Sequence, residues 1–151
     1  MNLLSKISYY FVLVLSVIFI YLSVTNIYSQ YLVEALAHGT TIKNVIQYLS
    51  SVTTLVATII IFVGLIQKSK WLVAFTVAYI AVIELLGIYR LIIFQNPGNF
   101  IAGTILNLLF LVPVLLNKKI LFDGKLIHGW FVVGVLLGIV DFISTILKNQ
   151  L

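Results

Sequence analysis

Five apolar segments, separated by short polar breaks, run the length of this chain. A helix rises about 1.5 Å per residue and the hydrocarbon core of a bilayer is about 30 Å thick, so a span needs roughly 20 residues with few charges. The five predicted helices cover approximately residues 7–28, 45–66, 71–94, 100–116 and 127–147. The fourth is the shortest and contains Pro113, so it is expected either to be kinked or to be extended by Asn99 and Asn117 at its ends. The pattern predicts an all-α, polytopic transmembrane bundle that forms a single domain over residues 1–151.

Composition supports lipid as the solvent for most of this surface. Hydrophobic residues make up 62% of the chain and charged residues 9%, with a mean hydropathy of +1.20. Soluble domains have about 45–50% apolar and about 25% charged residues. The chain has no cysteine, which excludes disulfides, cysteine nucleophiles and cysteine metal sites. Its net charge of +5 comes from lysines dispersed among the breaks, so no nucleic-acid partner is expected.

The lysines also predict how the bundle is oriented. The first segment exceeds the 7–15 apolar residues of a signal-peptide core and lacks a small-residue cleavage pattern after it, so we expect it to remain as a helix. With a cytoplasmic N-terminus and an extracytoplasmic C-terminus, six basic residues face the cytoplasm: Lys6, Lys68, Lys70, Lys118, Lys119 and Lys125. Three face the other side: Lys43, Arg90 and Lys148. This bias follows the positive-inside rule and places Trp71 and Trp130 at the cytoplasmic boundary.

Polar side chains within the spans are confined to one side of the membrane. Glu84 follows Trp71 by thirteen residues and Asp141 follows Trp130 by eleven, so both acids lie about 15–20 Å above the inner boundary, as does Asn107. Polar residues on the extracytoplasmic side of this level include Asn26, Thr54, Arg90, Asn99 and Thr145. The cytoplasmic half is almost wholly apolar. This asymmetry predicts a polar pocket that opens outward and ends near the midplane.

Each polar group has a structural explanation beside the functional one. Serine and threonine stripes in membrane helices serve mostly as packing surfaces and hydrogen bonds between helices. Arg90 could extend to the outer headgroups. Glu84 and Asp141 are harder to explain in this way, because a charged carboxylate near the bilayer centre costs at least about 2.5–3.5 kcal/mol. We therefore expect them to face a cavity, a partner or an ion route.

Glycines mark the helix faces expected to pack closely. Gly134 and Gly138 precede Asp141 on one face of the last helix, in the Gly-x-x-x-Gly spacing that allows backbones to approach. This face could serve a homo-oligomer, a membrane-protein partner or packing within the chain. Gly87 and Gly103 are further candidates for helix packing. The spacing of Ser23, Asn26, Gln30 and Glu34 indicates that the first helix projects beyond the bilayer.

The sequence leaves three classes of function open. The first is a protein that binds or transports a small solute, an ion or a lipid headgroup through its outward pocket. The second is a non-catalytic accessory, assembly or immunity-type subunit of another membrane protein. The third is an intramembrane enzyme acting on a lipid-linked substrate; it has least support, since the chain contains no catalytic motif. His38 and His128 have no partner at metal-ligand spacing, so neither a metal nor another cofactor is expected. The abundance of Ile, Leu, Asn and Lys favours a prokaryotic plasma membrane.

Overall fold

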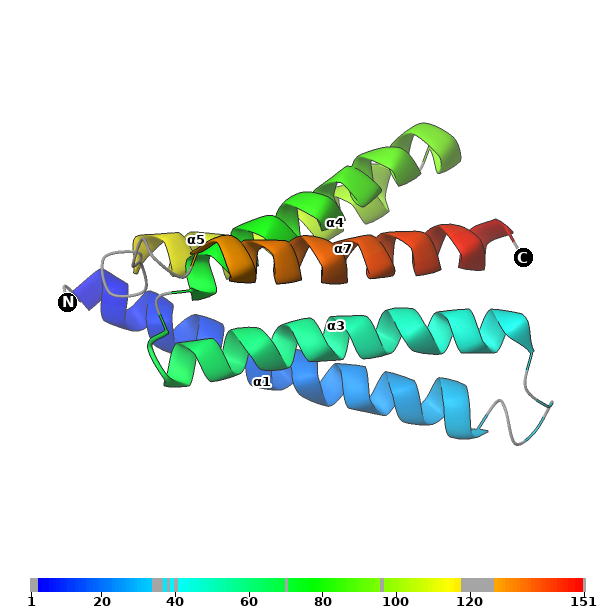
Figure 1. The fold of residues 1–151 in the computed structure, drawn as a ribbon, viewed down its shortest axis with the longest axis horizontal. Helices are drawn as coiled ribbons and strands as arrows, with labels where there is room; N and C mark the ends of the chain where they lie inside the picture. Colours follow the sequence, from blue (N-terminus) through cyan, green and yellow to red (C-terminus); the bar gives the residue numbers. More distant parts are fainter. Residues whose placement is uncertain are drawn as a thin grey trace.

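A computed structural model describes residues 3–33, 37, 39, 41–69, 71–95, 97–117 and 127–150 (Figure 1). The helices are α1 (Leu3–Ile27), which continues into the π-helical segment η1 (Tyr28–Val33), then α3 (Ile42–Ile66), α4 (Leu72–Phe94), α5 (Pro97–Leu116) and α7 (Ile127–Gln150). These residues contain no β-strand, which confirms the all-α prediction. Some residues discussed above lie outside the described set: Glu34, His38, Lys70, Lys118, Lys119 and Lys125. The same holds for the side chains of Gln30, Lys43, Asn99, His128 and Lys148.

Four helices are long and apolar enough to cross a membrane. Their qualifying segments are Lys6–Ile27, Asn44–Ile66, Leu72–Ile93 and Gly129–Leu147. The apolar part of α5, Phe100–Leu116, is shorter, in agreement with the shortest predicted segment. The chain is therefore a helical membrane bundle. Within α5 the helix runs through Pro113 to its end at Leu116.

Local capping explains where some helices begin and end. The Thr41 hydroxyl accepts a hydrogen bond from the backbone N–H of Asn44 at 3.2 Å, which satisfies one of the free donors at the start of α3. Gln95 closes α4 in a left-handed conformation, with φ of 49°, and Pro97 starts α5 directly afterwards. Beyond Ile27, η1 carries the first helix to Val33, as the polar spacing at its end predicted.

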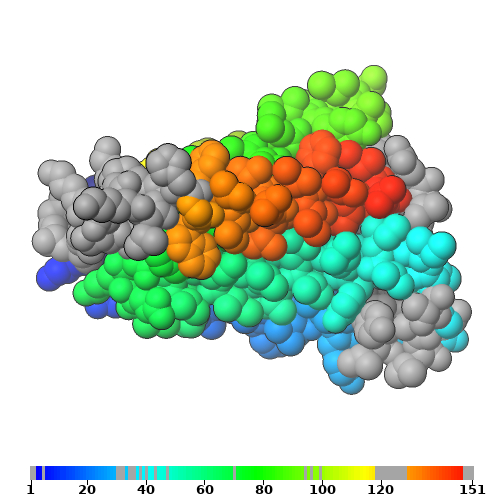
Figure 2. All heavy atoms as spheres, in the orientation of Figure 1, coloured from blue at the N-terminus to red at the C-terminus, as the bar shows by residue number. Residues whose placement is uncertain are grey.

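The five long helices pack in a closed ring whose order differs from their order in the chain. Around the ring, α1 contacts α3, α3 contacts α7, α7 contacts α4, α4 contacts α5, and α5 returns to α1. Figure 2 shows α7 lying directly against α3 across one face of the molecule. The start of α1 and the end of α7 lie at opposite ends of the bundle (Figure 1), as five successive helices that alternate in direction require.

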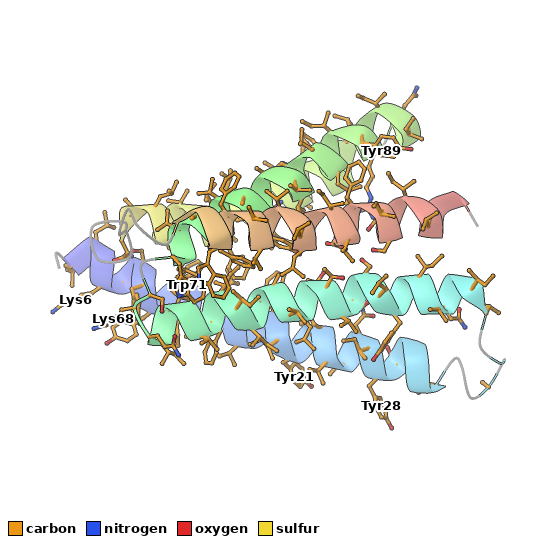
Figure 3. The ribbon with its side chains drawn as sticks, viewed as in Figure 1. Lys6, Tyr21, Tyr28, Lys68, Trp71 and Tyr89 are labelled. Atoms are coloured by element: carbon orange, nitrogen blue, oxygen red, sulfur yellow. The ribbon has the colours of Figure 1, made fainter. Side chains whose placement is uncertain are left out.

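One end of the ring is closed by an apolar and aromatic core. Trp71 and Trp130 stack with ring centroids 4.0 Å apart, so they lie at one level of the bundle, as the sequence predicted. Lys6 and Lys68 lie at this same end, whereas Tyr28 and Tyr89 lie toward the other (Figure 3). The buried core includes Ile61, Leu65, Leu72, Phe75, Phe110 and Val114. We refer to this end as the tryptophan end.

Two hydrogen bonds tie α1 across the tryptophan end. The Tyr9 hydroxyl donates to the backbone carbonyl of Leu65 in α3 at 2.6 Å, and the Asn117 side-chain amide donates to the Ser8 hydroxyl at 3.3 Å. Because α1 exposes most of its apolar side chains, including Tyr21 at 67%, these polar ties fix the position of a helix that buries little surface against its neighbours. Exposed apolar faces of this kind are what lipid covers.

Candidate functional site

Asp141 lies where three helices converge. It projects from α7 and is 7% exposed. One carboxylate oxygen, Oδ1, accepts a hydrogen bond from the Ser50 hydroxyl of α3 at 2.6 Å. The other, Oδ2, accepts a longer hydrogen bond from the Tyr79 hydroxyl of α4 at 3.4 Å. We call Asp141, Ser50 and Tyr79 the interior site, since hydrogen bonds from two helices position a carboxylate of the third inside the ring.

Thr54 lies at the edge of the interior site. Its side chain is within hydrogen-bonding range of Tyr79, and its own hydroxyl donates to the Ser50 backbone carbonyl at 3.1 Å. One turn further along α3, the Thr58 hydroxyl donates in the same way to the Thr54 carbonyl at 2.8 Å. The threonines of the predicted stripe therefore bond largely to their own helix, the structural role that such residues most often have. Unlike Thr58, Thr54 also lies beside Tyr79, which donates a hydrogen bond to Asp141.

Arg90 faces the same side of α4 as Tyr79. It follows Tyr79 by eleven residues, which places the two about 20° apart around the helix and about 16 Å apart along it. Leu72 and Leu86, seven residues before and after Tyr79, share this face and are buried. Arg90 is nevertheless exposed. The preceding residue, Tyr89, lies beside Phe142, the residue after Asp141, with ring centroids 6.0 Å apart. The inward face of α4 is thus covered near the tryptophan end and accessible near Arg90.

Glu84 belongs to a different cluster. Its oxygen Oε1 accepts a hydrogen bond from the Asn107 amide at 2.7 Å, and Oε2 accepts one from the Thr104 hydroxyl at 2.9 Å, both in α5. Glu84 is five residues from Tyr79, so the two side chains leave α4 about 140° apart. The structure therefore brings Glu84 and Asn107 together, as the depth argument expected, but it does not bring them onto one surface with Asp141.

Asn26 also lies apart from the interior site. Its side-chain amide is 3.5 Å from the Ser51 hydroxyl, at the limit of a hydrogen bond, and this contact joins α1 to α3. Ser51 follows Ser50 directly, so its side chain leaves α3 about 100° away from the one that holds Asp141. Asn26 is exposed and does not reach the carboxylate cluster.

The glycine face of α7 packs on α4. A Cβ atom added at Gly134 would lie 2.6 Å from the backbone oxygen of Phe75, and one at Gly138 would lie 2.7 Å from Cβ of Val82. Both glycines are buried, so the face that the sequence offered to a partner is occupied by α4 of the same chain. A Cβ atom added at Gly87 would lie 3.1 Å from the Phe100 ring of α5, whereas one added at Gly103 would have nothing within 4 Å.

Sequence reasoning missed three side chains that hold the carboxylates. Ser50 precedes Thr54 by four residues and Thr104 precedes Asn107 by three, so helical spacing from a recognised polar residue could have found both. Tyr79 could not be found in this way, because a tyrosine within an apolar segment is typical of a side chain that packs in the core. Its role follows only from the contact between α4 and α7.

The described residues contain no group of three or more His, Asp or Glu side chains that could hold a metal ion. Each carboxylate instead accepts two hydrogen bonds from neutral donors. The chain matches no protein-family model, no curated protein and no solved structure. The fold thus shows a helical membrane protein with two separate polar clusters.

Proposed function

We propose that this protein binds a small polar solute, an ion or a lipid headgroup at the interior site, from the extracytoplasmic side of a prokaryotic plasma membrane. The observation that carries the proposal is the carboxylate of Asp141, buried near the middle of the bundle and held by α3 and α4. Burying such a group in a membrane protein is costly, and these groups are typical of solute and ion pathways.

The position of Arg90 supports access from one end. This side chain lies on the face of α4 that carries Tyr79 but is exposed, about five residues beyond the level of Asp141. At the tryptophan end, the stacked Trp71 and Trp130 and the surrounding apolar core close the bundle. A ligand would therefore approach past Arg90 and meet Asp141. The lysine bias puts the Arg90 end outside the cell.

We assign a structural role to the Glu84 cluster. Both of its oxygens accept hydrogen bonds from α5, which joins the α4–α5 pair through charge-assisted bonds. Glu84 projects about 140° away from the face that carries Tyr79 and Arg90. It consequently provides a matched control for Asp141, with the same charge at a similar depth.

Labelling of introduced cysteines tests the proposed route, and the natural chain has no cysteine to interfere. A membrane-impermeant thiol reagent is added to intact cells that produce the single variants Arg90→Cys or Thr54→Cys. Both should react, because water must reach their thiolates. Val56→Cys and Ile88→Cys are the controls: these residues lie two positions away, are exposed on the surface of the bundle and should face lipid, where thiols stay protonated and unreactive.

The labelling pattern separates the proposal from its alternatives. Reaction of Arg90→Cys alone would mean that the path stops at the outer boundary, and would exclude ligand access to Asp141. Reaction of Thr54→Cys only in inverted vesicles would reverse the predicted orientation. Equal reactivity at Thr54→Cys and Val56→Cys would show that no distinct interior path exists.

A further inference from the structure

Two side chains of opposite charge lie on the neighbouring helices α4 and α7 without forming an ion pair. Among the described residues, no carboxylate oxygen lies within the 4.0 Å limit of an ion pair from the Arg90 guanidinium. Asp141 accepts hydrogen bonds only from the neutral hydroxyls of Ser50 and Tyr79. Gly138 of α7 packs against Val82 of α4, and the two helices run in the same direction. Arg90 is eight residues beyond Val82 and Asp141 is three beyond Gly138, so the two levels differ by about five residues, or about 7.5 Å. The two charges are thus too far apart for a direct ion pair and close enough for one small ligand to reach both.

Each of these groups retains unused hydrogen-bonding capacity. An ionised carboxylate has about four acceptor positions, and Asp141 uses two of them. The Arg90 guanidinium has five N–H donors in a planar fork suited to a phosphate or a carboxylate, and it makes no hydrogen bond with a described residue. A ligand could therefore add bonds at both ends without displacing Ser50 or Tyr79.

The arrangement also discriminates against ligands with a single charge. A simple cation that reaches Asp141 must pass Arg90, which repels it, and a simple anion held by Arg90 is repelled by Asp141. A ligand that carries both charges meets a favourable partner at each end.

We infer that the interior site recognises a zwitterion that has a primary ammonium group and an anionic group, the ammonium toward Asp141 and the phosphate or carboxylate toward Arg90. The inference rests on the proposed function and names the class of ligand for the same site. Such a zwitterion occurs as a free solute, for example an amino acid, and as the headgroup of an ethanolamine phospholipid.

Calorimetric titration of the purified protein in detergent tests the inference with matched probes. Phosphoethanolamine and glycine carry both charges, ethanolamine carries only the ammonium, and inorganic phosphate carries only the anion. At least one zwitterion should bind about tenfold or more tightly than either single-charge probe. Lysophosphatidylethanolamine then identifies the source: tighter binding than phosphoethanolamine assigns a lipid headgroup, and equal or weaker binding assigns a free solute.

Three variants connect this selectivity to the two charges. Asp141→Asn and Arg90→Gln should each weaken zwitterion binding by about tenfold or more. Glu84→Gln is the control: it also replaces a carboxylate by an amide, on the other side of α4, and should bind the zwitterion like the natural protein. Gel filtration of each variant establishes that it is folded. If a variant does not fold, the comparison of probes on the natural protein still decides the question.

Contrary results have separate meanings for the inference and the proposed function. Ethanolamine or phosphate binding as tightly as the zwitterions, or failure of both zwitterions to bind, would overturn the inference. If Thr54→Cys were nevertheless labelled from outside, the proposed access route would stand without this ligand class. If Thr54→Cys were not labelled and no probe bound, both would fail.

Discussion

Replacing Gly134 with alanine tests the packing of α7 on α4 directly. The new Cβ atom would lie 2.6 Å from the carbonyl oxygen of Phe75, 3.1 Å from Cβ of Ala78 and 3.2 Å from the backbone nitrogen of Tyr79. Two of these three atoms belong to the α4 backbone, which cannot rotate away as a flexible side chain can. The variant can accommodate the methyl group only if the two helices separate.

The size of the effect follows from that separation. Carbon and carbonyl oxygen in contact are about 3.3–3.6 Å apart, so α7 must move by about 0.7–1.0 Å. A gap of this size forfeits about a quarter to a half of the dispersion energy of the atoms it separates. Overpacking substitutions cost about 1–3 kcal/mol, and a loss of about 2 kcal/mol lowers the melting temperature of a chain of this length by about 4–8 °C.

Gly103→Ala is the matched control. The same methyl group is added in the middle of α5, where nothing lies within 4 Å of the added Cβ. Its melting temperature should stay unchanged or rise, because alanine favours a helix over glycine by about 1 kcal/mol. Both melting temperatures are measured by gel filtration after heating in detergent. Equal responses of the two variants would refute the claim that α7 approaches α4 closely at Gly134.

Two further substitutions test individual buried polar groups by the same thermal assay. Thr76 is fully buried, and its hydroxyl has no hydrogen-bond partner among the described residues. Thr76→Val should therefore raise the melting temperature by about 2–4 °C, whereas Thr76→Ser, which keeps the hydroxyl, should lower it. A lower melting temperature in Thr76→Val would show that the hydroxyl has a partner. Asn107→Leu removes the 2.7 Å hydrogen bond to Glu84 and should lower the stability of the folded protein by about 1–3 kcal/mol. The control, Asn26→Leu, loses only a contact of 3.5 Å and should change the stability little. Similar melting temperatures of the two variants would argue against a structural role for the Glu84 cluster.

The membrane class and the helices could be predicted from the sequence because the bilayer constrains them strongly. Every backbone N–H and C=O within lipid must be hydrogen-bonded inside the segment, so a long apolar segment can only be a helix. Relative levels along the helices could be predicted as well, since the rise per residue is constant. Trp71 and Trp130, both expected at one boundary from their positions at the starts of their helices, stack on each other.

The neighbours of each helix could not be predicted in this way. Depth places Glu84 and Asp141 at one level but leaves the rotation and the order of the helices undetermined. These are set by close packing, such as Gly134 and Gly138 against Phe75 and Val82. The glycine spacing predicted a close contact without naming its partner, because α4, another chain or a second copy would satisfy it equally. Depth placed Glu84, Asn107 and Asp141 at one level, whereas the contact of Asn107 with Glu84 and the separation of both from Asp141 emerged only in the structure.

The order of the ring has a consequence for biogenesis. Helices α3 and α4 are consecutive in the chain, but in the ring α7 packs between them along most of their length. The Asp141 carboxylate of α7 accepts hydrogen bonds from Ser50 of α3 and Tyr79 of α4. During synthesis, α3 and α4 enter the membrane before α7 has been made. Until α7 arrives, the hydroxyls of Ser50 and Tyr79 lack the Asp141 carboxylate that accepts their hydrogen bonds. The bundle therefore cannot mature helix by helix, and insertion of α7 between its two predecessors is the step that completes both the ring and the site.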